Sequence, residues 1–317
     1  MARARNEPGV DAAVDELRTL QDLVRWGASR FNQADLFYGH GTDNAIDEAL
    51  QLVTHALHLP RDLSPELLQA RLTRQERRGA AELLVRRLTE RRPAAYLTHE
   101  AWFAGLSFYV DERVLVPRSP IAELIDHGFE PWVEPEGVDR ILDLCTGSGC
   151  IAVACALAFP GARVDAADIS EDALQVARIN VDRYALEDRV RLFDSDLYAG
   201  LQGRTYDLIV TNPPYVGRAE MASLPPEYGF EPRVGLYSGE QGLDCIQRIL
   251  GGAAEHLNPG GVLVAEVGHS RAALEARFPR VPFVWVEFQR GGEGVFALAR
   301  DQLVEYRPEF QEGAPSA

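Results

Sequence analysis

Strand-like and helical runs alternate between residues 140 and 299, and this alternation constrains the fold more than any other feature of the chain. Parallel strands joined by right-handed crossovers produce such a pattern, so the sequence predicts an α/β sandwich. Only residues 289–293 separate the last two strand-like runs, which should therefore pair antiparallel at an edge of the sheet. The seven expected strands are 141–145, 163–168, 190–194, 208–211, 261–267, 283–288 and 294–299, and helices should begin near Cys150, Asp172, Leu243 and Arg271.

The first part of the chain has helical spacing instead. Apolar residues recur at the intervals of a helix face between residues 12 and 92, with one turn-rich interruption at 38–44. Thr73, followed three residues later by Glu76, has the form of a capping box, and Pro93 should end the helix that it opens. The sequence therefore predicts a helical N-terminal domain in front of the sheet.

A short stretch between these two parts has the texture of a hairpin. Aromatic and β-branched residues fill 102–110 and 114–116, and the polar residues 111–113 lie between the two runs. Such a pattern predicts two antiparallel strands around a tight turn. We therefore expect a hairpin and linker over residues 96–134, between a helical domain at 1–95 and the main domain at 135–317.

Charge excludes several classes of function. All 32 basic side chains are Arg, since the chain contains no Lys, and 48 acidic side chains bring the net charge to −16. A lysine Schiff base and a P-loop lysine are therefore excluded. A surface this acidic does not suit binding of nucleic acid over the whole molecule, but it favours a basic protein partner. Residues 61–92 are the exception, with nine Arg against five acids.

Compartment and metal content follow from the same inventory. No stretch approaches 18 apolar residues, and residues 1–16 are charged, so we expect a cytoplasmic protein without membrane contact. The four cysteines form no C-x-x-C pair, and no histidine lies at zinc-ligand spacing from them. They therefore predict buried thiols, with neither a disulfide framework nor a metal site.

A glycine-rich turn follows the first expected strand of the main domain. Glycines in such a turn let a ligand approach the backbone, and the following helix presents free N–H groups. Asp168, at the end of the next strand, can accept both ribose hydroxyls of a nucleoside. The turn fits S-adenosyl-L-methionine, a nicotinamide or flavin cofactor, or a purely structural role. The expected ligand-binding turn consists of Cys145, Thr146, Gly147, Ser148 and Gly149.

Two further acids bear on the choice of ligand. Asp143 lies two residues before the end of its strand, where it would repel a pyrophosphate but attract a sulfonium or amino group. It can equally cap neighbouring N–H groups. After the third strand, Asp196 can reach adenine and Leu197 can cover the ring, although the same residues suit an ordinary surface turn.

A second motif follows the fourth strand and reads Asn212, Pro213, Pro214, Tyr215. Because proline has no backbone N–H, carbonyl oxygens nearby stay available as acceptors, and Asn212 adds a side-chain acceptor. Tyr215 adds an aromatic face. The motif therefore suits a flat nitrogen group with two N–H donors, such as a carboxamide or an exocyclic amine, and we expect these four residues to be catalytic. A packed proline-rich turn is the structural alternative.

By these motifs the chain resembles the class I S-adenosyl-L-methionine-dependent methyltransferases that modify glutamine amides in proteins. The resemblance implies a Rossmann-like sheet, with Ile169 and Asn212 added to the cofactor contacts and S-adenosyl-L-homocysteine as the product. It also implies that the helical domain 1–95 recognises the substrate. The segments that match are 116–120, 143–149, 168–170, 212–215, 231–233, 239–243 and 266–268, although residues 235–238 depart from the family pattern.

Two branches of that family modify different proteins. The stretches at 26–31 and 38–44, and Ser119 after Arg118, resemble the branch that methylates the third protein of the large ribosomal subunit. Methylation of peptide-release factors, or of adenine in nucleic acid, remains an alternative. Arg118 can contact substrate or form a local salt bridge, and His40 can contact substrate or simply occupy a turn. The basic stretch Arg71–Arg92 can bind ribosomal RNA or be a solvated helix face.

Overall fold

A computed structural model describes residues 9–60 and 62–311. Its contacts divide the chain into two compact units, one formed by Met1–Glu100 with Pro225–Phe230 and the other by Ala101–Leu224 with Glu231–Ala317. Of the expected hairpin and linker over residues 96–134, residues 96–100 belong to the first unit and residues 101–134 to the second. The six residues Pro225–Phe230, which lie in the middle of the expected main domain, belong to the first unit.

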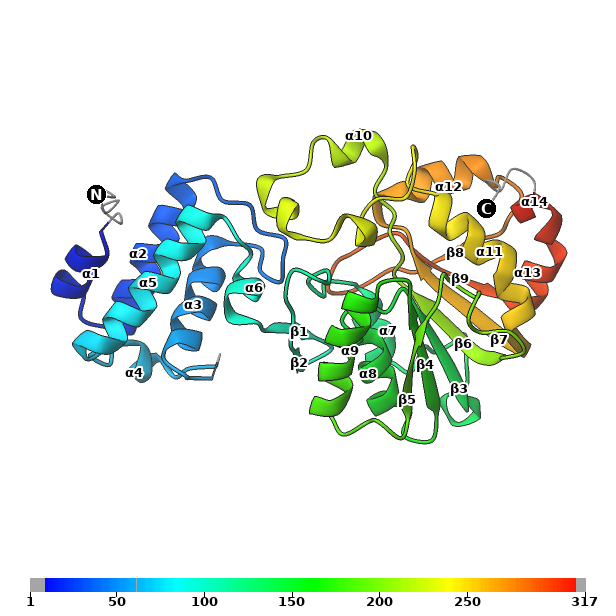
Figure 1. The fold of residues 1–317 in the computed structure, drawn as a ribbon, viewed down its shortest axis with the longest axis horizontal. Helices are drawn as coiled ribbons and strands as arrows, with labels where there is room; N and C mark the ends of the chain where they lie inside the picture. The colour runs from blue at the N-terminus through cyan, green and yellow to red at the C-terminus, as the bar shows by residue number, and fades with distance from the viewer. Residues whose placement is uncertain (1–8, 61, 312–317) are drawn as a thin grey trace. The chain divides into compact units, whose positions relative to one another are not determined.

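The first unit is helical, as its apolar spacing predicts. A core of aliphatic side chains lies between α1, α2, α3 and α5, and Figure 1 shows these helices gathered in one bundle. The elements are α1 (Val10–Glu16), α2 (Leu20–Gln33), α3 (Ala45–Ala56), α4 (Pro65–Leu68), α5 (Arg74–Glu90), α6 (Ala94–Thr98) and the 3-10 turn η2 (Pro226–Phe230).

The longest helix of this unit begins and ends where the sequence predicts. At its start Thr73 accepts from the backbone N–H of Glu76 at 3.3 Å, and the Glu76 carboxylate accepts from the N–H of Thr73 at 2.7 Å. This reciprocal pair satisfies two N–H groups that the helix leaves open. The helix stops at Glu90, because Arg91 turns into the left-handed region and Pro93 follows.

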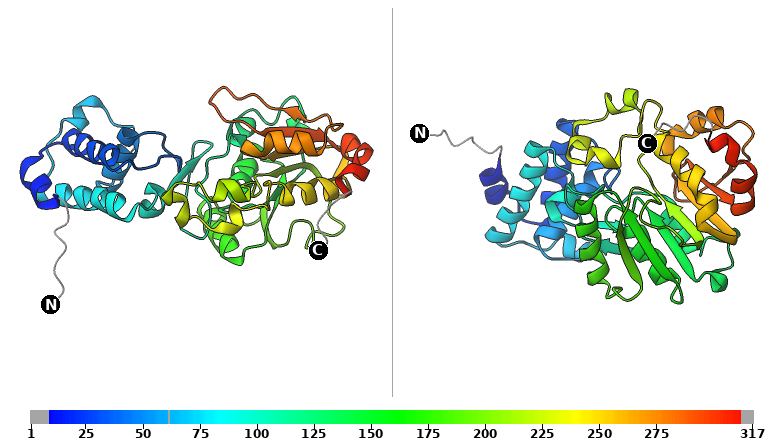
Figure 2. Two further views of the ribbon diagram at one scale, coloured as in Figure 1. Left: turned by 90° about the horizontal axis from the view of Figure 1, so that it is seen from above. Right: turned by 45° about the vertical axis from the view of Figure 1, so that its right-hand side comes forward.

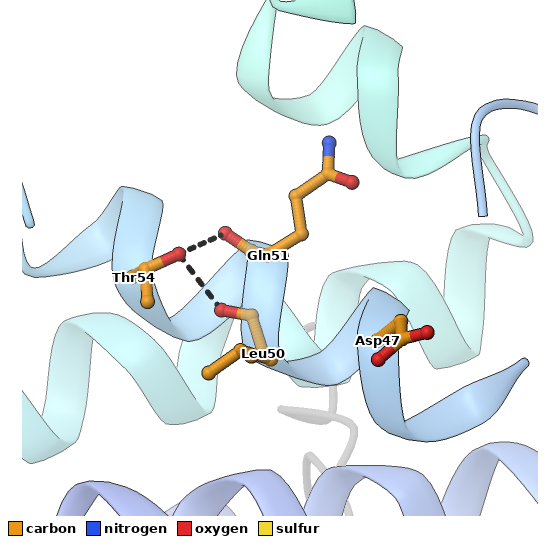
Figure 3. Close-up of a pocket in the computed structure, with 4 residues that line it drawn as sticks. All are labelled: Asp47, Leu50, Gln51 and Thr54. Atoms are coloured by element: carbon orange, nitrogen blue, oxygen red, sulfur yellow. Dashed lines mark hydrogen bonds between the residues drawn. The ribbon is translucent and has the colours of Figure 1, made fainter. Parts of the chain in front are cut away.

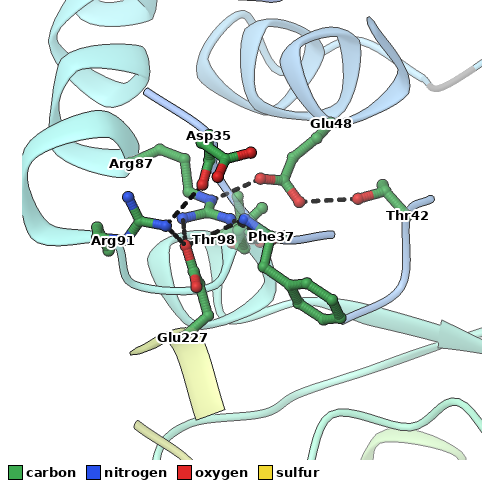
Figure 4. Close-up of polar contacts among 9 residues, drawn as sticks. Asp35, Phe37, Thr42, Glu48, Arg87, Arg91, Thr98 and Glu227 are labelled. Carbon is green, nitrogen blue, oxygen red and sulfur yellow. Dashed lines mark hydrogen bonds and ion pairs between the residues drawn. The ribbon is translucent and has the colours of Figure 1, made fainter. Parts of the chain in front are cut away.

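Buried charges hold the interior of the first unit together (Figure 4). Arg87 is fully buried, and its Nε lies 2.5 Å from Oε1 of Glu48, which is also buried. Glu227, from η2, is 0% exposed and accepts from Nη2 of Arg91 at 2.8 Å and from the backbone N–H of Phe37 at 3.2 Å. One ionic cluster therefore brings together residues 37, 48, 87–91 and 227.

The second unit is an α/β sandwich, as expected. Helices cover both faces of its large sheet, as Figures 1 and 2 show. Its elements are β1 (Ala101–Phe103), β2 (Leu106–Phe108), α7 (Ile121–Asp126), η1 (Pro135–Gly137), β3 (Arg140–Leu144), α8 (Cys150–Ala158), β4 (Arg163–Asp168), α9 (Glu171–Arg183), β5 (Val190–Asp194), β6 (Tyr206–Thr211), α10 (Arg218–Met221), η3 (Arg233–Gly235), α11 (Asp244–His256), β7 (Leu257–Glu266), η4 (Gly268–Ser270), α12 (Arg271–Arg277), β8 (Val284–Trp285), β9 (Val295–Ala299), α13 (Arg300–Glu305) and α14 (Arg307–Gln311).

The large sheet has seven strands in the order β5-β4-β3-β6-β7-β9-β8. The first five pair in parallel, whereas β9 pairs antiparallel with both β7 and β8, as the short connection predicts. Alternate residues of each strand face opposite sides, so Ile141 enters the core that contains α8 and Leu142 enters the core that contains α11.

The hairpin that we expected around residues 111–113 is wrong. Strands β1 and β2 pair with each other within residues 101–108, and Ala104 and Gly105 form their turn. Both turn residues have positive φ, 47° and 73°, as the type I′ turn of a two-residue hairpin requires. Alanine rarely takes this conformation, so the turn has no sequence signature. Asp111 instead closes a local turn by accepting from the backbone N–H of Arg113 at 3.1 Å.

No helix within residues 9–60 and 62–311 is both long enough and apolar enough to cross a membrane.

Replacing Arg87 by Met should destabilise the first unit strongly. The substitution removes the cation but leaves the buried carboxylates of Glu48 and Glu227, and breaking a buried pair in this way costs about 3–5 kcal/mol. Its neighbour Arg86 is a matched control, because it forms an exposed pair with Glu90 on the same helix, and Arg86→Gln should cost about 0.5 kcal/mol or less. Urea unfolding followed by circular dichroism measures both, and equal losses would contradict the role of the buried cluster.

Candidate active site

The carboxyl ends of the central parallel strands meet at one edge of the sheet. In the register of β3, β6 and β7, Leu144 lies beside Thr211, which lies beside Ala265. The glycine-rich turn follows β3, the Asn212 turn follows β6, and Glu266 ends β7. Because ligands of such sheets bind beyond this edge, the candidate site lies here.

A shallow hollow elsewhere does not qualify as the site. It lies on helix α3 of the first unit and is lined by Asp47, Leu50, Gln51 and Thr54 (Figure 3). The Thr54 hydroxyl donates to the carbonyls of Leu50 and Gln51, 2.9 and 3.1 Å away in its own helix. These contacts belong to ordinary helix structure, and no chemistry is indicated.

The glycine-rich turn takes the sharp path that its composition predicts. Gly149 has φ of 78° and directly precedes α8, and a Cβ at this position would lie 3.1 Å from Cβ of Ala177 on the neighbouring helix. Cys145 has φ of 58° although it carries a side chain, and a hydrogen bond with Cys245 together with burial raises the pKa of its thiol. Ser148 is buried, and its carbonyl accepts from Asn180 at 2.9 Å.

Asp143 is fully buried beneath this turn. Its Oδ2 accepts from the Thr146 hydroxyl at 2.6 Å and from the backbone N–H of Ala152 at 3.0 Å. Among the residues that the structure describes, none donates to its other oxygen, Oδ1. Burial raises the pKa of Asp143 to about 7, against the effect of the two donors. A buried carboxylate with one open oxygen fits a ligand that brings a positive charge or an N–H donor.

Asp168, at the end of β4, is held by backbone donors. Its Oδ2 accepts from the N–H of Gly147 and its Oδ1 from the N–H of Ser170, both at 2.9 Å. Burial raises the pKa of this carboxyl, and the backbone N–H groups of Ser170, Gly147 and Ile169 oppose the effect. Each oxygen keeps a second acceptor position, which suits two ribose hydroxyls. The next residue, Ile169, is 56% exposed and offers an apolar surface for a base.

The residues expected to contact adenine have partners within the protein. The carboxylate of Asp196 forms an ion pair with Arg248 at 2.8 Å, and both side chains are almost half exposed. Leu197 is 8% exposed and packs in the core beside α11. Their adenine contact stays a prediction. Taken together, the open oxygen of Asp143, the rigid Asp168 and the exposed Ile169 fit S-adenosyl-L-methionine.

The turn after β6 lies at this same edge of the sheet, because Asn212 directly follows Thr211, the last residue of the strand. Among the described residues, none forms a hydrogen bond with the Asn212 side chain or with the Pro213 carbonyl. The chain beyond the turn is anchored, because Val216 donates to the carbonyl of Leu236 at 2.8 Å and accepts from the N–H of Ser238 at 3.0 Å. The block that contains residues 231–243 therefore supports the turn.

Arg118 and His40, whose roles the sequence left open, both contact other residues in the structure. Arg118 forms a bidentate ion pair with Glu231, at 2.5 and 2.8 Å, and Glu231 also accepts from the backbone N–H of Val116 at 3.1 Å. The salt bridge that we considered for Arg118 therefore exists, but its partner lies 113 residues away rather than in the hairpin. In the first unit, His40 is 4% exposed and its ring packs 4.7 Å from the ring of Tyr228.

Glu266 is a further buried acid that the sequence did not single out for any role. Its two carboxylate oxygens accept from the hydroxyls of Ser119 and Tyr215. Two sequence signals point to it: it begins the matching segment 266–268, and it is an acidic residue at the end of a strongly apolar strand, where a charge needs a partner.

The pKa of Asp143 predicts how cofactor affinity depends on pH. A cationic ligand binds the ionised carboxylate better, so affinity for S-adenosyl-L-methionine should rise as the pH increases from 6 through about 7 and level off above it, with proton release on binding. Calorimetry in buffers of different ionisation enthalpy measures both effects. Asp143→Asn should bind more weakly and remove the pH dependence.

The same pKa shift has a separate effect on the free protein. Because folding raises this pKa above its ordinary value of 3.8, the contribution of Asp143 to the free energy of unfolding is complete below pH 3.8 and is lost as the pH rises through about 7.

The binding prediction has its own contradicting outcome. An affinity for S-adenosyl-L-methionine that stays constant between pH 6 and 8 in the wild type would show that Asp143 does not face the ligand.

Known proteins resemble the chain over nearly its whole length. Residues 132–224 match the family model of the methyltransferase small domain. The ribosomal protein uL3 glutamine methyltransferase of Xanthomonas campestris pv. campestris is 54% identical over 301 residues, which cover 95% of this chain and 97% of that protein. The enzyme of the same description from Xylella fastidiosa is 55% identical over 295 residues, which cover 93% and 94%.

A solved structure of a T. thermophilus 16S rRNA N2 G1207 methyltransferase, in complex with AdoMet and guanosine, is 21% identical with a TM-score of 0.42 and covers 63% of this chain and 49% of that one. The identity to the two curated relatives, over more than nine-tenths of each sequence, decides the family. The chain belongs to the family of the ribosomal protein uL3 glutamine methyltransferases.

Proposed function

We propose that this enzyme transfers the methyl group of S-adenosyl-L-methionine to the side-chain amide nitrogen of a glutamine in ribosomal protein uL3, with S-adenosyl-L-homocysteine as the second product. The proposal rests on one observation above others: the acceptors of the Asn212 turn lie in a chain that is 54% identical to enzymes described by that reaction. The residues of the turn support the type of reaction, and the names of the relatives support the choice of protein substrate.

Asn212 and Pro213 solve the chemical problem of the reaction. An amide nitrogen is a poor nucleophile because its lone pair is delocalised into the carbonyl. When the Asn212 side-chain oxygen and the Pro213 carbonyl accept the two N–H bonds, electron density returns to nitrogen and the amide is fixed in direction. No strong base is needed before transfer, because the nitrogen becomes acidic only as it gains positive charge. Such orientation can contribute about 7 kcal/mol or more to lowering the barrier.

The edge residues of β3 and β4 form the other half of the proposed site. S-adenosyl-L-methionine supplies an electrophilic methyl group on a positively charged sulfur. Asp143 offers a carboxylate oxygen to that positive charge or to the ammonium group, and Asp168 holds the ribose hydroxyls. The turn Cys145–Gly149 lets the ligand approach the backbone. No residue of this set is a metal ligand in the proposal.

Charge favours a basic protein as substrate. The chain carries a net charge of −16, and ribosomal proteins that bind RNA are basic, so attraction between opposite charges raises the rate of encounter. We expect the reaction in the cytoplasm, where such proteins join the ribosome.

Ribosomal RNA is a second contact in this proposal, through the basic stretch Arg71–Arg92. Several of the arginines on this stretch already pair with acids: Arg74 with Asp15, Arg78 with Asp11, and Arg86 with Glu90. RNA phosphates would have to displace these acids, so any binding should be weak and strongly dependent on salt.

Asn212→Ala should abolish methyl transfer while preserving the fold and cofactor binding. Removing one preorganised polar contact to a reacting group costs about 100-fold or more in kcat. Asn258→Ala is the matched control, because Asn258 also carries an amide on the sheet but pairs with Asp207 near the opposite ends of the strands. Turnover of radiolabelled cofactor on purified uL3 measures both variants, and an Asn212→Ala enzyme of normal kcat would refute the role of the turn.

The substrate itself is tested with a mixture. Incubation of the enzyme with labelled cofactor, the unassembled proteins of the large subunit and the peptide-release factors should label uL3 alone, and fragment mapping should find the methyl group on a glutamine. Labelling of the release factors instead would assign the enzyme to the branch of the family that methylates peptide-release factors. Methyl incorporation into nucleic acid stripped of protein would support the adenine alternative.

A further inference from the structure

Glu266 lies at the centre of the candidate site without an assigned role. It is the last residue of β7, it is 5% exposed, and it follows Ala265, which lies beside Thr211 at the start of the Asn212 turn. A carboxylate in such a buried place is retained only where its contacts offset the loss of hydration.

Two hydroxyl groups use the two oxygens of this carboxylate. Oε2 accepts from the Ser119 hydroxyl at 2.5 Å, and Oε1 accepts from the Tyr215 hydroxyl at 3.0 Å. Burial raises the pKa of Glu266, whereas both hydroxyls and the nearby charge of Arg118 favour the ionised form. Ser119 in turn accepts from the backbone N–H of Ile121 at 3.2 Å, where α7 begins. The carboxylate therefore links Tyr215, through Ser119, to the start of α7.

The tyrosine is fixed at its other end and along one ring face. Its carbonyl accepts from the Ser270 hydroxyl at 2.8 Å. Its ring passes so close to Gly268 that a Cβ there would lie 2.7 Å from Cε2 of the ring, and Gly268 has φ of 45°. Backbone, ring and hydroxyl are thus each held by a different neighbour, and only the hydroxyl contact depends on Glu266.

We propose that Glu266 is a positioning residue for methyl transfer, which acts by holding the Tyr215 ring in one orientation beside the Asn212 turn. This inference rests on the proposed function, because the orientation of the ring affects the reaction only if the Asn212 turn binds the substrate amide. Ser119 belongs to the same device, since it holds the second oxygen of the carboxylate in place.

The device should affect kcat more than KM. Asn212 and Pro213 hold the incoming amide without the tyrosine hydroxyl, so ground-state binding survives when the anchor is lost. A ring that is free to rotate no longer restricts the amide to the line of attack, and a misplacement of about 1 Å can cost about 100-fold in rate. Cofactor affinity should not change, because Asp143 and Asp168 do not contact Glu266.

A double-mutant cycle on Glu266 and Tyr215 tests the inference. Tyr215→Phe and Glu266→Leu should each lower kcat about 10- to 100-fold, change KM for the protein substrate less than about threefold, and leave affinity for S-adenosyl-L-homocysteine unchanged. The double variant should be no slower than the slower single variant, because both changes break the same contact. Glu266→Gln keeps the shape and one acceptor oxygen, and it should recover part of the lost rate.

Tyr206→Phe provides the matched control. Tyr206 is also buried and its hydroxyl donates to a buried carboxylate, that of Asp165, at 2.9 Å, but it lies at the first residue of β6, far along the strand from the turn. It should lower the free energy of unfolding and leave kcat within about twofold. If the losses of Tyr215→Phe and Glu266→Leu multiply, or if Tyr206→Phe slows the reaction as much, the inference is overturned.

Ring motion of the tyrosine separates this inference from the proposed function. In protein labelled at the tyrosine Cβ, the Tyr215 side chain should occupy one χ1 rotamer in the wild type and average between rotamers in Glu266→Leu, as nuclear magnetic resonance couplings measure without any substrate. If the wild type fails to methylate uL3 but modifies another protein, the kinetic cycle is run on that protein and only the substrate assignment falls. A Tyr215 side chain with the same χ1 distribution in both proteins rejects the anchoring outright.

Discussion

The register of three parallel strands is the constraint on which the candidate site depends. Leu144, Thr211 and Ala265 lie side by side across β3, β6 and β7, although more than 50 residues of chain separate each from the next. The glycine-rich turn, the Asn212 turn and Glu266 follow these positions directly. Side chains alternate between the faces of a sheet, so a slip of one residue in any pair would exchange the buried and site-facing side chains of a whole strand. Apolar packing on both faces of the sheet therefore fixes the chemistry at its edge.

The buried carboxylates at this edge differ in how many of their oxygens accept hydrogen bonds from the protein. Asp168 and Glu266 each have both oxygens occupied by the protein, the former by backbone N–H groups and the latter by hydroxyls. Both side chains are therefore held rigidly in place. Asp143 keeps one oxygen without a donor among the described residues, and burial raises its pKa to about 7. A buried carboxylate without its full set of hydrogen bonds lowers the stability of the fold. Such a group is typical of a site that binds a ligand of opposite charge.

Local patterns in the sequence predicted most of the fold, and contacts between distant residues account for what it missed. The bounds of β4 and β5 agree with the expected 163–168 and 190–194, and the Thr73 capping box forms as its spacing indicates. The hairpin was misplaced because Ala104 takes a conformation that its side chain disfavours. The glycine-rich turn and the Asn212 turn carry their own signatures. The partners of Arg118 and Glu266 do not, because they lie between 51 and 147 residues away along the chain and are brought close only by the finished sheet.

The helical unit is discontinuous, and this has a consequence for how the protein can be dissected. Its interior contains the carboxylate of Glu227, which arrives from a segment encoded more than 120 codons after the last helix of the unit. A clone that ends near residue 100 would leave Arg91 and Phe37 without their acceptor inside an otherwise complete bundle. On the ribosome, likewise, the bundle cannot be completed when its own helices emerge, but only after β6 and the Asn212 turn have been synthesised. Folding of the helical unit is thus coupled in time to folding of the sheet edge at which the candidate site lies.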